Sequence, residues 1–205
     1  MKYKRLWILL GGLLLVSAAL LLLDFRVAVG DTQSLQMLMV TELEGNYPDR
    51  LQPDDKISMV LVGDGALVRA LQKALTANID KVGTSQIEWE QELKSNYPNP
   101  VLVVKVGQPG PIWTPFFGVS QFSVQAGYAT DGDTTFMAAL DKMQPYIRSS
   151  DPSVVNLYTE YEVSDRSFGL ISRPGYDGYL AEYLAQEIVQ ALKNLYNIQD
   201  LTGGP

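Results

Sequence analysis

"KISMVLVGDGALVRALQKALTANI", residues Lys56–Ile79, contains a predicted strand, a predicted turn and a predicted helix in succession. The first of these, Ile57–Val62, is an almost continuous apolar run, which is typical of a strand buried on both faces. The two glycines of Gly63–Gly65 indicate a tight turn. Leucines at four-residue spacing then predict one face of an amphipathic helix, formed by Leu67, Leu71 and Leu75.

A second amphipathic helix is predicted near the C-terminus, within "DGYLAEYLAQEIVQALKNLY" (Asp177–Tyr196). Asp177 stands where an N-cap belongs, because its carboxylate can accept hydrogen bonds from the free N–H groups of the first turn. The apolar stripe of this helix consists of Leu180, Leu184, Ile188, Ala191 and Leu195.

The segments between the two helices predict strands at Ile87–Glu90, Val101–Gly107 and Phe116–Thr130. The sequence "SDR" at positions 164–166 suggests a hairpin turn between Val154–Val163 and Ser167–Ser172. The connecting loops look too short for helical crossovers, so neighbouring strands should be antiparallel. We therefore expect an α+β fold, with a mainly antiparallel sheet of about five to six strands and two amphipathic helices packed on one face.

The N-terminal segment predicts a membrane anchor that runs from Leu6 and Trp7 to Leu23, carries no charge and follows the basic tetrapeptide "KYKR". A helix of that length is roughly 27 Å long, close to the ~30 Å hydrocarbon core of a bilayer. A cleaved secretory leader has an apolar region of only ~7–15 residues, so we favour a retained transmembrane helix over residues 6–23. The alternative is a cleaved leader, with small residues for the cut at Ser17–Ala19 or Ala28–Gly30.

Charge predicts the orientation and the partners. Lys2, Lys4 and Arg5 precede the predicted anchor, so residues 1–5 should stay in the cytoplasm and the rest should lie outside it. All 23 acidic residues and 13 of the 16 basic residues follow the anchor, which leaves that part with a net charge of −10. A body this acidic is a poor partner for nucleic acids, and nucleic-acid binding is excluded.

The predicted domain organisation follows from these features. Residues 24–55 form a tether with one short element, Leu35–Gly45, whose pattern fits a helix or a strand. Residues 56–198 form the extracytoplasmic α+β domain, and residues 199–205 form a flexible C-terminal tail.

The chain contains neither histidine nor cysteine. Disulfides, thiolate nucleophiles, Ser–His and Cys–His triads, and zinc sites built from these residues are therefore excluded. A lipid anchor attached to cysteine is excluded for the same reason. We expect no bound cofactor and no metal site.

Two stretches, "ISMVLVGDGALVRALQKAL" (Ile57–Leu75) and "GYLAEYLAQEIVQALKNL" (Gly178–Leu195), carry a family resemblance and cover about a fifth of the chain. Their order, after an apolar N-terminus and around a long meander of strands, resembles small envelope proteins of the lipopolysaccharide-assembly lipoprotein type. The chain departs from that type because it has no lipid-accepting cysteine and is far more acidic. The resemblance implies an architecture, and a fold alone does not assign a function.

Two loops have residues that could bind ions. Gly63, Asp64 and Gly65 precede a helix N-terminus, whose free N–H groups can bind an anion. The longer glycine pattern of a phosphate loop is missing, so we favour a turn in which Asp64 caps the helix. Asp131 and Asp133 have the spacing of the first two ligands of a calcium loop, but no acidic ligand follows soon after, and a simple turn is favoured.

Two carboxylate pairs are the remaining catalytic candidates. Glu88 with Glu90, and Glu160 with Glu162, each place two acids on one face of a strand about 7 Å apart. Such a pair can perform general acid–base catalysis when burial raises the pKa of one carboxyl. Solvent-facing strands produce the same pattern, so we favour a non-catalytic function over a carboxylate-dependent hydrolase.

Proline-rich loops carry aromatic residues that could form an interaction surface. Aromatic side chains held rigidly in loops are typical contact groups of protein interfaces. The alternative is that they cover the ends of the core, which we favour for Phe116, while a surface position is favoured for Trp113. The candidate interaction residues are Tyr97, Trp113, Phe117, Tyr176 and Tyr179.

The sequence therefore predicts a membrane-anchored, extracytoplasmic binding or assembly module of the bacterial cell envelope. Its expected partners are the lipid bilayer, through the N-terminal helix, and another membrane or envelope protein. One alternative is a single-span accessory subunit of a larger membrane protein complex, and the other is the hydrolase described above.

Overall fold

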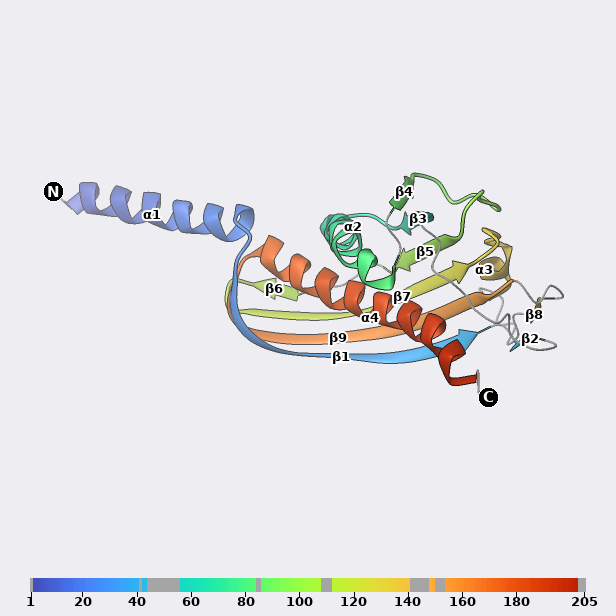
Figure 1. Ribbon diagram of the computed structural model, residues 1–205. Coiled ribbons are helices and arrows are strands. Elements are labelled where there is room, and N and C mark those ends of the chain that lie inside the picture. The colour runs from blue at the N-terminus through green and yellow to red at the C-terminus, as the bar shows by residue number, and fades with distance from the viewer. Residues whose placement is uncertain are drawn as a thin grey trace.

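The computed structural model describes residues 2–40, 42–43, 56–83, 86–107, 112–140, 148–149 and 154–202. The helices shown in Figure 1 are α1 (Lys2–Leu22), α2 (Ala66–Asn78), α3 (Thr135–Leu140) and α4 (Arg173–Thr202), with a short 3₁₀ helix, η1 (Ile79–Val82), after α2. The strands are β1 (Arg26–Val40), β2 (Glu42–Leu43), β3 (Lys56–Val62), β4 (Gln86–Glu90), β5 (Val101–Val106), β6 (Ile112–Thr114), β7 (Phe117–Ala129), β8 (Arg148–Ser149) and β9 (Asn156–Ile171).

The fold is α+β, built on one mixed sheet that has seven strands in the described part of the chain. The order is β1-β9-β7-β5-β3-β4, and β6 pairs with the start of β7. Strands β1, β9, β7 and β5 are antiparallel to their neighbours in that series, whereas β3 is parallel to both β4 and β5. The predicted smaller and mainly antiparallel sheet is therefore wrong. A separate parallel pair is formed by β2 and β8.

The parallel part of the sheet arises from two connections. Helices α2 and η1 carry the chain back to the start of β3, so that β4 runs parallel to it. The connection over residues 91–100 contains no helix, yet at about 3.3 Å per extended residue it can reach ~33 Å, which is more than the length of the five-residue strand β4. Buried Tyr97 holds this loop, because its N–H donates to the carbonyl of Gly132 at 3.0 Å. The loop over residues 91–100 therefore makes the crossover from β4 to β5 without a helix, although its length had predicted antiparallel neighbours.

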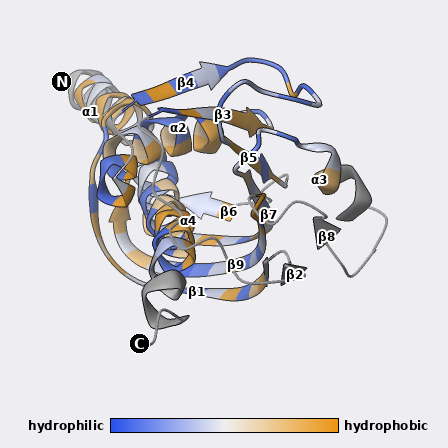
Figure 2. Cartoon of the chain, turned by 45° about the vertical axis from the view of Figure 1, so that its right-hand side comes forward, coloured by the Kyte–Doolittle hydropathy of each residue, from blue (hydrophilic) through white to orange (hydrophobic). Residues whose placement is uncertain are grey.

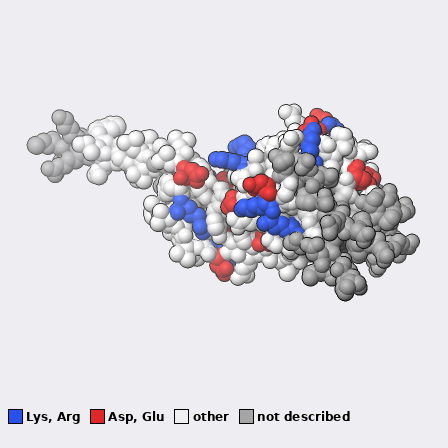
Figure 3. Space-filling model, in the orientation of Figure 1, with Lys and Arg blue, Asp and Glu red and all other residues white. Residues whose placement is uncertain are grey.

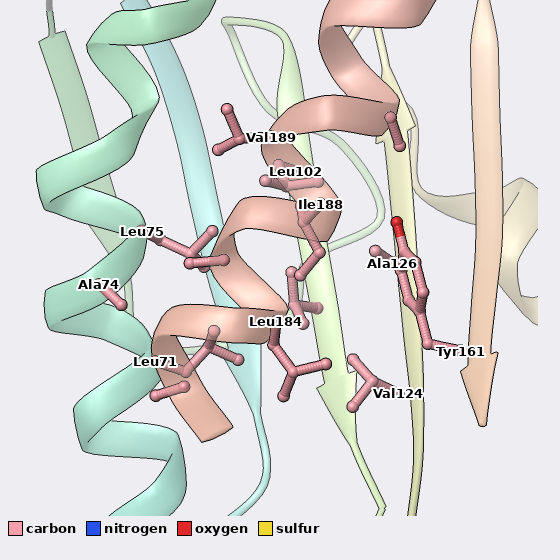
Figure 4. Packing of buried hydrophobic residues seen from close by; sticks show 14 of the residues in the cluster. Leu71, Ala74, Leu75, Leu102, Val124, Ala126, Tyr161, Leu184, Ile188 and Val189 are labelled. Atoms are coloured by element: carbon pink, nitrogen blue, oxygen red, sulfur yellow. The ribbon is translucent and has the colours of Figure 1, made fainter. Parts of the chain in front are cut away.

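The main core lies between the sheet and the two helices α2 and α4, as Figure 4 shows. Leu71 and Leu75 of α2 and Leu184 of α4 are fully buried, and each buried leucine contributes about 1.5–3 kcal/mol to stability. In Figure 2, β3 and β5 are hydrophobic over most of their length, whereas hydrophobic and polar residues alternate along β1 and β9. The strands β3 and β5 need this composition because a second cluster covers their other face, formed by Val60, Tyr97, Val101, Val103, Ala129 and Met137.

Strand β9 is continuous from Asn156 to Ile171, so the predicted hairpin with a turn at positions 164–166 is wrong. Asp165, the residue expected in that turn, is fully buried on the helix-covered face of the sheet. Its carboxylate accepts hydrogen bonds from Thr32 Oγ1 at 2.6 Å and from the Tyr176 hydroxyl at 2.7 Å. Thr32 lies 133 residues away in the sequence, and Tyr176 lies on the following helix. Together they satisfy an acid that would otherwise favour a turn.

Strand β1 occupies much of the segment predicted as a tether. It pairs with β9 along its whole length, from Arg26 opposite Ile171 to Val40 opposite Leu157. Part of the ambiguous element Leu35–Gly45 therefore belongs to a strand, while residues 41 and 44–55 lie outside the described part. The sequence pattern assigns no element to Thr134–Arg148, and of this stretch the structure describes Thr134, α3 and Arg148, the first residue of β8.

The N-cap of helix α4 lies five residues earlier than predicted. Ser172 is its N-cap, because its Oγ accepts a hydrogen bond from the N–H of Gly175 at 3.0 Å. Asp177 instead lies inside the helix and is buried. At the other end, α4 continues to Thr202, into the segment predicted as a flexible tail.

Helix α1 begins at Lys2 and projects away from the rest of the molecule in Figure 1. In the part of the chain that the structure describes, we find no helix with the combined length and apolar character needed to cross a membrane. The predicted transmembrane helix over residues 6–23 is therefore corrected.

Candidate interaction surface

The two faces of the sheet differ over strands β1, β9 and β7. Helix α4 lies against one face, where Tyr161, Val163 and Asp165 of β9 are buried. The side chains that alternate with them point to the opposite face, and Glu162, Ser164, Arg166, Phe168 and Leu170 are all exposed there. We call this opposite side the open face.

One end of the open face is apolar. Val29, Phe168 and Phe117 lie directly opposite one another across β1, β9 and β7, and Val27 lies opposite Leu170. Their exposed fractions run from 37% for Phe117 to 83% for Val29. On β6, Ile112 is also exposed, and it pairs with Val119 of β7 in the next row, which contains Arg166. We define the apolar patch as Val27, Val29, Ile112, Phe117, Phe168 and Leu170.

The rest of the open face is mainly polar. Asp31 lies opposite Arg166, immediately beside the apolar patch, and Gln33 and Gln121 flank Ser164 in the next row. The predicted carboxylate pair Glu160 and Glu162 lies further along the same face, next to Gln125 and Ser123. The apolar patch therefore has a polar border on the side of the sheet centre.

The five candidate aromatic residues do not gather at one place. Only Phe117 belongs to the apolar patch. Tyr97 and Tyr176 are buried, so a partner does not reach them in this structure. Trp113 packs against the main core, because on β6 it lies opposite Gly118 on the helix-covered face, and Tyr179 is also half-buried against that core. Phe116, expected in the core, is instead 69% exposed in the turn before β7.

The buried residues around Asp165 form a polar network. The hydroxyl of Tyr176 donates to Asp165 Oδ2 and lies 3.1 Å from Ser120 Oγ, and Ser167 Oγ donates to Asp165 at 3.1 Å. Burial raises the pKa of Tyr176, so this hydroxyl keeps its proton and remains a donor. Because Asp165, Ser167 and Tyr176 are fully buried, these groups stabilise the junction of β9 and α4 and are out of contact with solvent.

A cleft of about 710 Å³ lies between α2, the first turns of α4 and the start of β1. The Arg26 guanidinium stacks 3.5 Å above the ring centre of Tyr179, and Arg173 Nε donates to Asp177 Oδ2 at 3.1 Å. Burial raises the pKa of Asp177, and the nearby Arg173 partly opposes that shift. Figure 3 shows acidic and basic side chains interspersed on this side of the molecule. The charged lining residues are Asp24, Arg26, Arg69, Lys73, Arg173, Asp177 and Glu182. With charges this close to balance, the cleft is a weaker candidate than the apolar patch.

The two predicted ion-binding loops act as turns. The N-cap of α2 is Gly65, and no side chain caps the helix, so exposed Asp64 does not have the predicted capping role. Positive φ angles at Gly63 and Gly65 explain why glycine is needed on both sides of it. Asp131 and Asp133 accept hydrogen bonds from backbone N–H groups two residues further along the chain, as turn residues do. Within the described residues, no group of three acidic side chains is placed to hold a metal ion.

The second carboxylate pair lies at the opposite edge of the sheet, on β4. Glu88 forms a salt bridge with Lys56 at 2.8 Å, and the hydrogen bond from Lys56 lowers the pKa of Glu88. Glu90 pairs with Lys94 at 2.7 Å. Each acid thus has its own basic partner, which is the arrangement of surface ion pairs.

Most residues of the apolar patch were missed by the sequence analysis. The signal was available in principle, because Val27 and Val29, and likewise Phe168 and Leu170, are apolar residues at alternate positions. Their common face becomes visible only when β1 and β9 are paired in the observed register.

Comparisons with known proteins add little to this description. No family model matches the chain, and no curated protein matches its sequence. Among solved structures, it is similar to a PelC dodecamer from Paraburkholderia phytofirmans, with a TM-score of 0.35 and 12% identity over 78% of this chain and 98% of the other. It is also similar to a minor lipoprotein from Acinetobacter baumannii, with a TM-score of 0.28 and 13% identity over 72% of this chain and 94% of the other. Both scores are low, and the proposals below rest on the residues of this chain alone.

Proposed function

We propose that this chain is a non-catalytic binding or assembly module of the cell envelope that docks an apolar protein surface on its apolar patch. The observation that supports this proposal is the exposure of six large apolar side chains that lie side by side on β1, β6, β7 and β9. Contiguous exposed apolar patches on soluble domains mark interaction sites, whereas scattered single residues do not.

The surroundings of the patch fit a docking role. The strands that carry it are paired on both sides at β9 and β7, so the side chains are held in place before a partner arrives. Such preorganisation lowers the entropy cost of binding. Asp31 and Arg166 border the patch, and a polar border around an apolar centre is the usual anatomy of a protein interface.

Helix α1 supplies the lipid contact of the proposal. Its described side chains from Trp7 to Val16 are exposed and uncharged all around the helix, as Figure 3 shows for one side. A helix that is apolar on every side is stable when lipid or protein surrounds it. We propose that the lipid of a bilayer surrounds this helix and that the helix does not cross the bilayer. The extracytoplasmic location of the sheet domain remains a prediction.

Capture of partners from native membranes in mild detergent tests the docking proposal. The full-length chain should retain one or more proteins that Phe168→Glu loses, because this change places a charge in the centre of the apolar patch. Gln121→Glu is the matched control, since Gln121 is exposed on the same face outside the patch. Both side chains are exposed, so unfolding free energies should change by no more than about 0.5 kcal/mol. Equal capture by Phe168→Glu and the unaltered chain would contradict the proposal.

The same purification separates two forms of the proposal. Co-migration with a stable large assembly would make the chain an accessory subunit of a membrane complex. Reversible capture of a partner by an otherwise separate chain would support an assembly module.

A further inference from the structure

Strand β1 is an edge strand over its full 15 residues, since β9 is its one strand partner among the described residues. The carbonyl of Phe25 accepts a hydrogen bond from the N–H of Ser172, the residue opposite it. Hydrogen-bonded and non-hydrogen-bonded pairs alternate along an antiparallel ladder. The odd-numbered residues of β1 therefore bond to β9, and the even-numbered residues from 26 to 40 direct their N–H and C=O groups away from the sheet.

This edge lacks the features that normally prevent strand pairing. The sequence of β1, "RVAVGDTQSLQMLMV", contains no proline and no lysine, and its charged residues are Arg26 and Asp31. Its register with β9 runs without a bulge from Arg26 to Val40. Natural edge strands are usually short, bulged, or protected by lysine or proline. A long edge without any of these devices is suited to pairing with another strand.

We propose that the partner of this edge is the β1 strand of a second copy of the chain, antiparallel to the first and centred on Thr32. The side chains of β1 on the open face read apolar, apolar, polar, polar, apolar, apolar from residue 27 to residue 37. The pattern reads the same in both directions, so two antiparallel copies of the strand place apolar residues opposite apolar residues and polar residues opposite polar residues. Centring on Thr32 places Val27 opposite Met37, Val29 opposite Leu35, and Asp31 opposite Gln33.

The four apolar members of these pairs are more than half exposed in the single chain, with Leu35 at 74% and Met37 at 59%. Even-numbered residues lie opposite even-numbered residues in this register, so the N–H and C=O groups that each edge directs away from its own sheet meet. Shifts by one residue break that match. Shifts by two residues keep that match but spoil the side-chain pairs. In one direction Asp31 lies opposite Asp31, which brings two carboxylates together, and in the other direction Asp31 lies opposite Leu35.

The pairing has a consequence for the proposed function. It joins two sheets into one and sets Leu35 and Met37 of the second copy beside Val29 and Val27. The apolar patch of each chain is thereby enlarged across the junction. The closed two-fold symmetry uses both edges and leaves no edge of β1 free for further growth.

Disulfide trapping reads the register directly, because the chain contains no cysteine of its own. In the proposed register Val29 and Leu35 of opposite copies form a non-hydrogen-bonded pair with Cα atoms ~4.5 Å apart, within disulfide range. The full-length double variant V29C/L35C in mild detergent should therefore give a covalent dimer on gentle oxidation, whereas V29C or L35C alone should give little. A lack of covalent dimer from the double variant would overturn the proposal. Stronger trapping by D31C or Q33C alone would do so as well, because these report the shifted registers.

A non-covalent measurement keeps the test independent of cysteine chemistry. Light scattering of the unaltered full-length chain in detergent should give the mass of a dimer, and Leu35→Lys should weaken dimerisation at least tenfold. Phe168→Glu is the matched control, because Phe168 lies on the open face but one strand away from the edge. It should leave the dimer intact while it abolishes partner capture, which separates this inference from the proposed function. A monomer at all concentrations, or equal effects of the two substitutions on dimerisation, would contradict the pairing.

Discussion

Replacement of Tyr176 by phenylalanine tests the role of the buried network around Asp165. The tyrosine hydroxyl donates to Asp165 Oδ2 at 2.7 Å, and both residues are fully buried. Phenylalanine keeps the ring in its place against Gly118, so the substitution isolates the hydroxyl. A hydrogen bond to a carboxylate contributes about 1.5–3 kcal/mol, and we expect the free energy of unfolding to fall by that amount. In urea unfolding followed by circular dichroism, the midpoint should fall by roughly 1 M.

Tyr161→Phe provides the matched control. Tyr161 is equally buried, but its hydroxyl donates to a neutral acceptor, the backbone carbonyl of Glu187, at 3.2 Å. The loss should be about 0.5–1.5 kcal/mol, the value for a bond between neutral groups. If Tyr176→Phe costs no more than Tyr161→Phe, the network does not stabilise the junction of β9 and α4 in the way described.

Three further predictions concern pH and helix capping. Burial raises the pKa of Asp177 above its usual 3.8, so the folded state holds this proton more strongly than the unfolded state, and stability falls as pH rises above 3.8. The urea midpoint of Asp177→Asn should therefore improve relative to the unaltered chain as pH rises above 3.8, and a constant difference would contradict this. Burial raises the pKa of Tyr161 to about 12, so the free energy of unfolding should fall as pH rises above 10. Tyr161→Phe should make this fall less steep in alkaline unfolding experiments, and equal slopes for the two chains would refute the prediction. Ser172→Ala removes the hydrogen bonds that Ser172 Oγ accepts from the N–H groups of Gly175 and Phe25. The free energy of unfolding in urea should fall by about 1–2 kcal/mol, and a change near zero would rule out the N-cap.

The two large helices could be predicted because their packing is visible in local periodicity. The residues of the predicted stripes, such as Leu71 in α2 and Leu184 in α4, are buried in the structure. A helix buries one face whatever the order of the strands beneath it, so the 3.6-residue period is independent of the sheet topology. The helix ends were less accurate, since Ser172 rather than Asp177 begins α4.

The strands depended on contacts that are distant in sequence. Asp165 favours a turn in isolation, and its burial in β9 depends on Thr32 and Tyr176. Strand β1 resembled a tether because its helix-facing residues, such as Gly30 and Ser34, are small or polar. The transmembrane prediction rested on the length and composition of residues 6–23, and the structure gives no helix that meets both requirements within the described chain.

The candidate site was the hardest feature to predict. Phe117 was identified from its aromatic loop, but its neighbours Val29 and Phe168 come from strands separated by most of the chain. Their assembly into one patch requires the register of β1, β9 and β7. No local pattern contains that information, because each pair of apolar residues alone is compatible with a buried strand.

Site-specific photo-crosslinking in native membranes tests the central claim most directly. A photoreactive phenylalanine analogue at position 168 lies in the apolar patch, and the same analogue at position 162 lies exposed on the same strand and face outside it. We predict a distinct crosslinked product with another protein from position 168, and little or none from position 162. The absence of a product from position 168, or the same product at equal yield from both positions, would contradict the claim that the apolar patch is a docking surface.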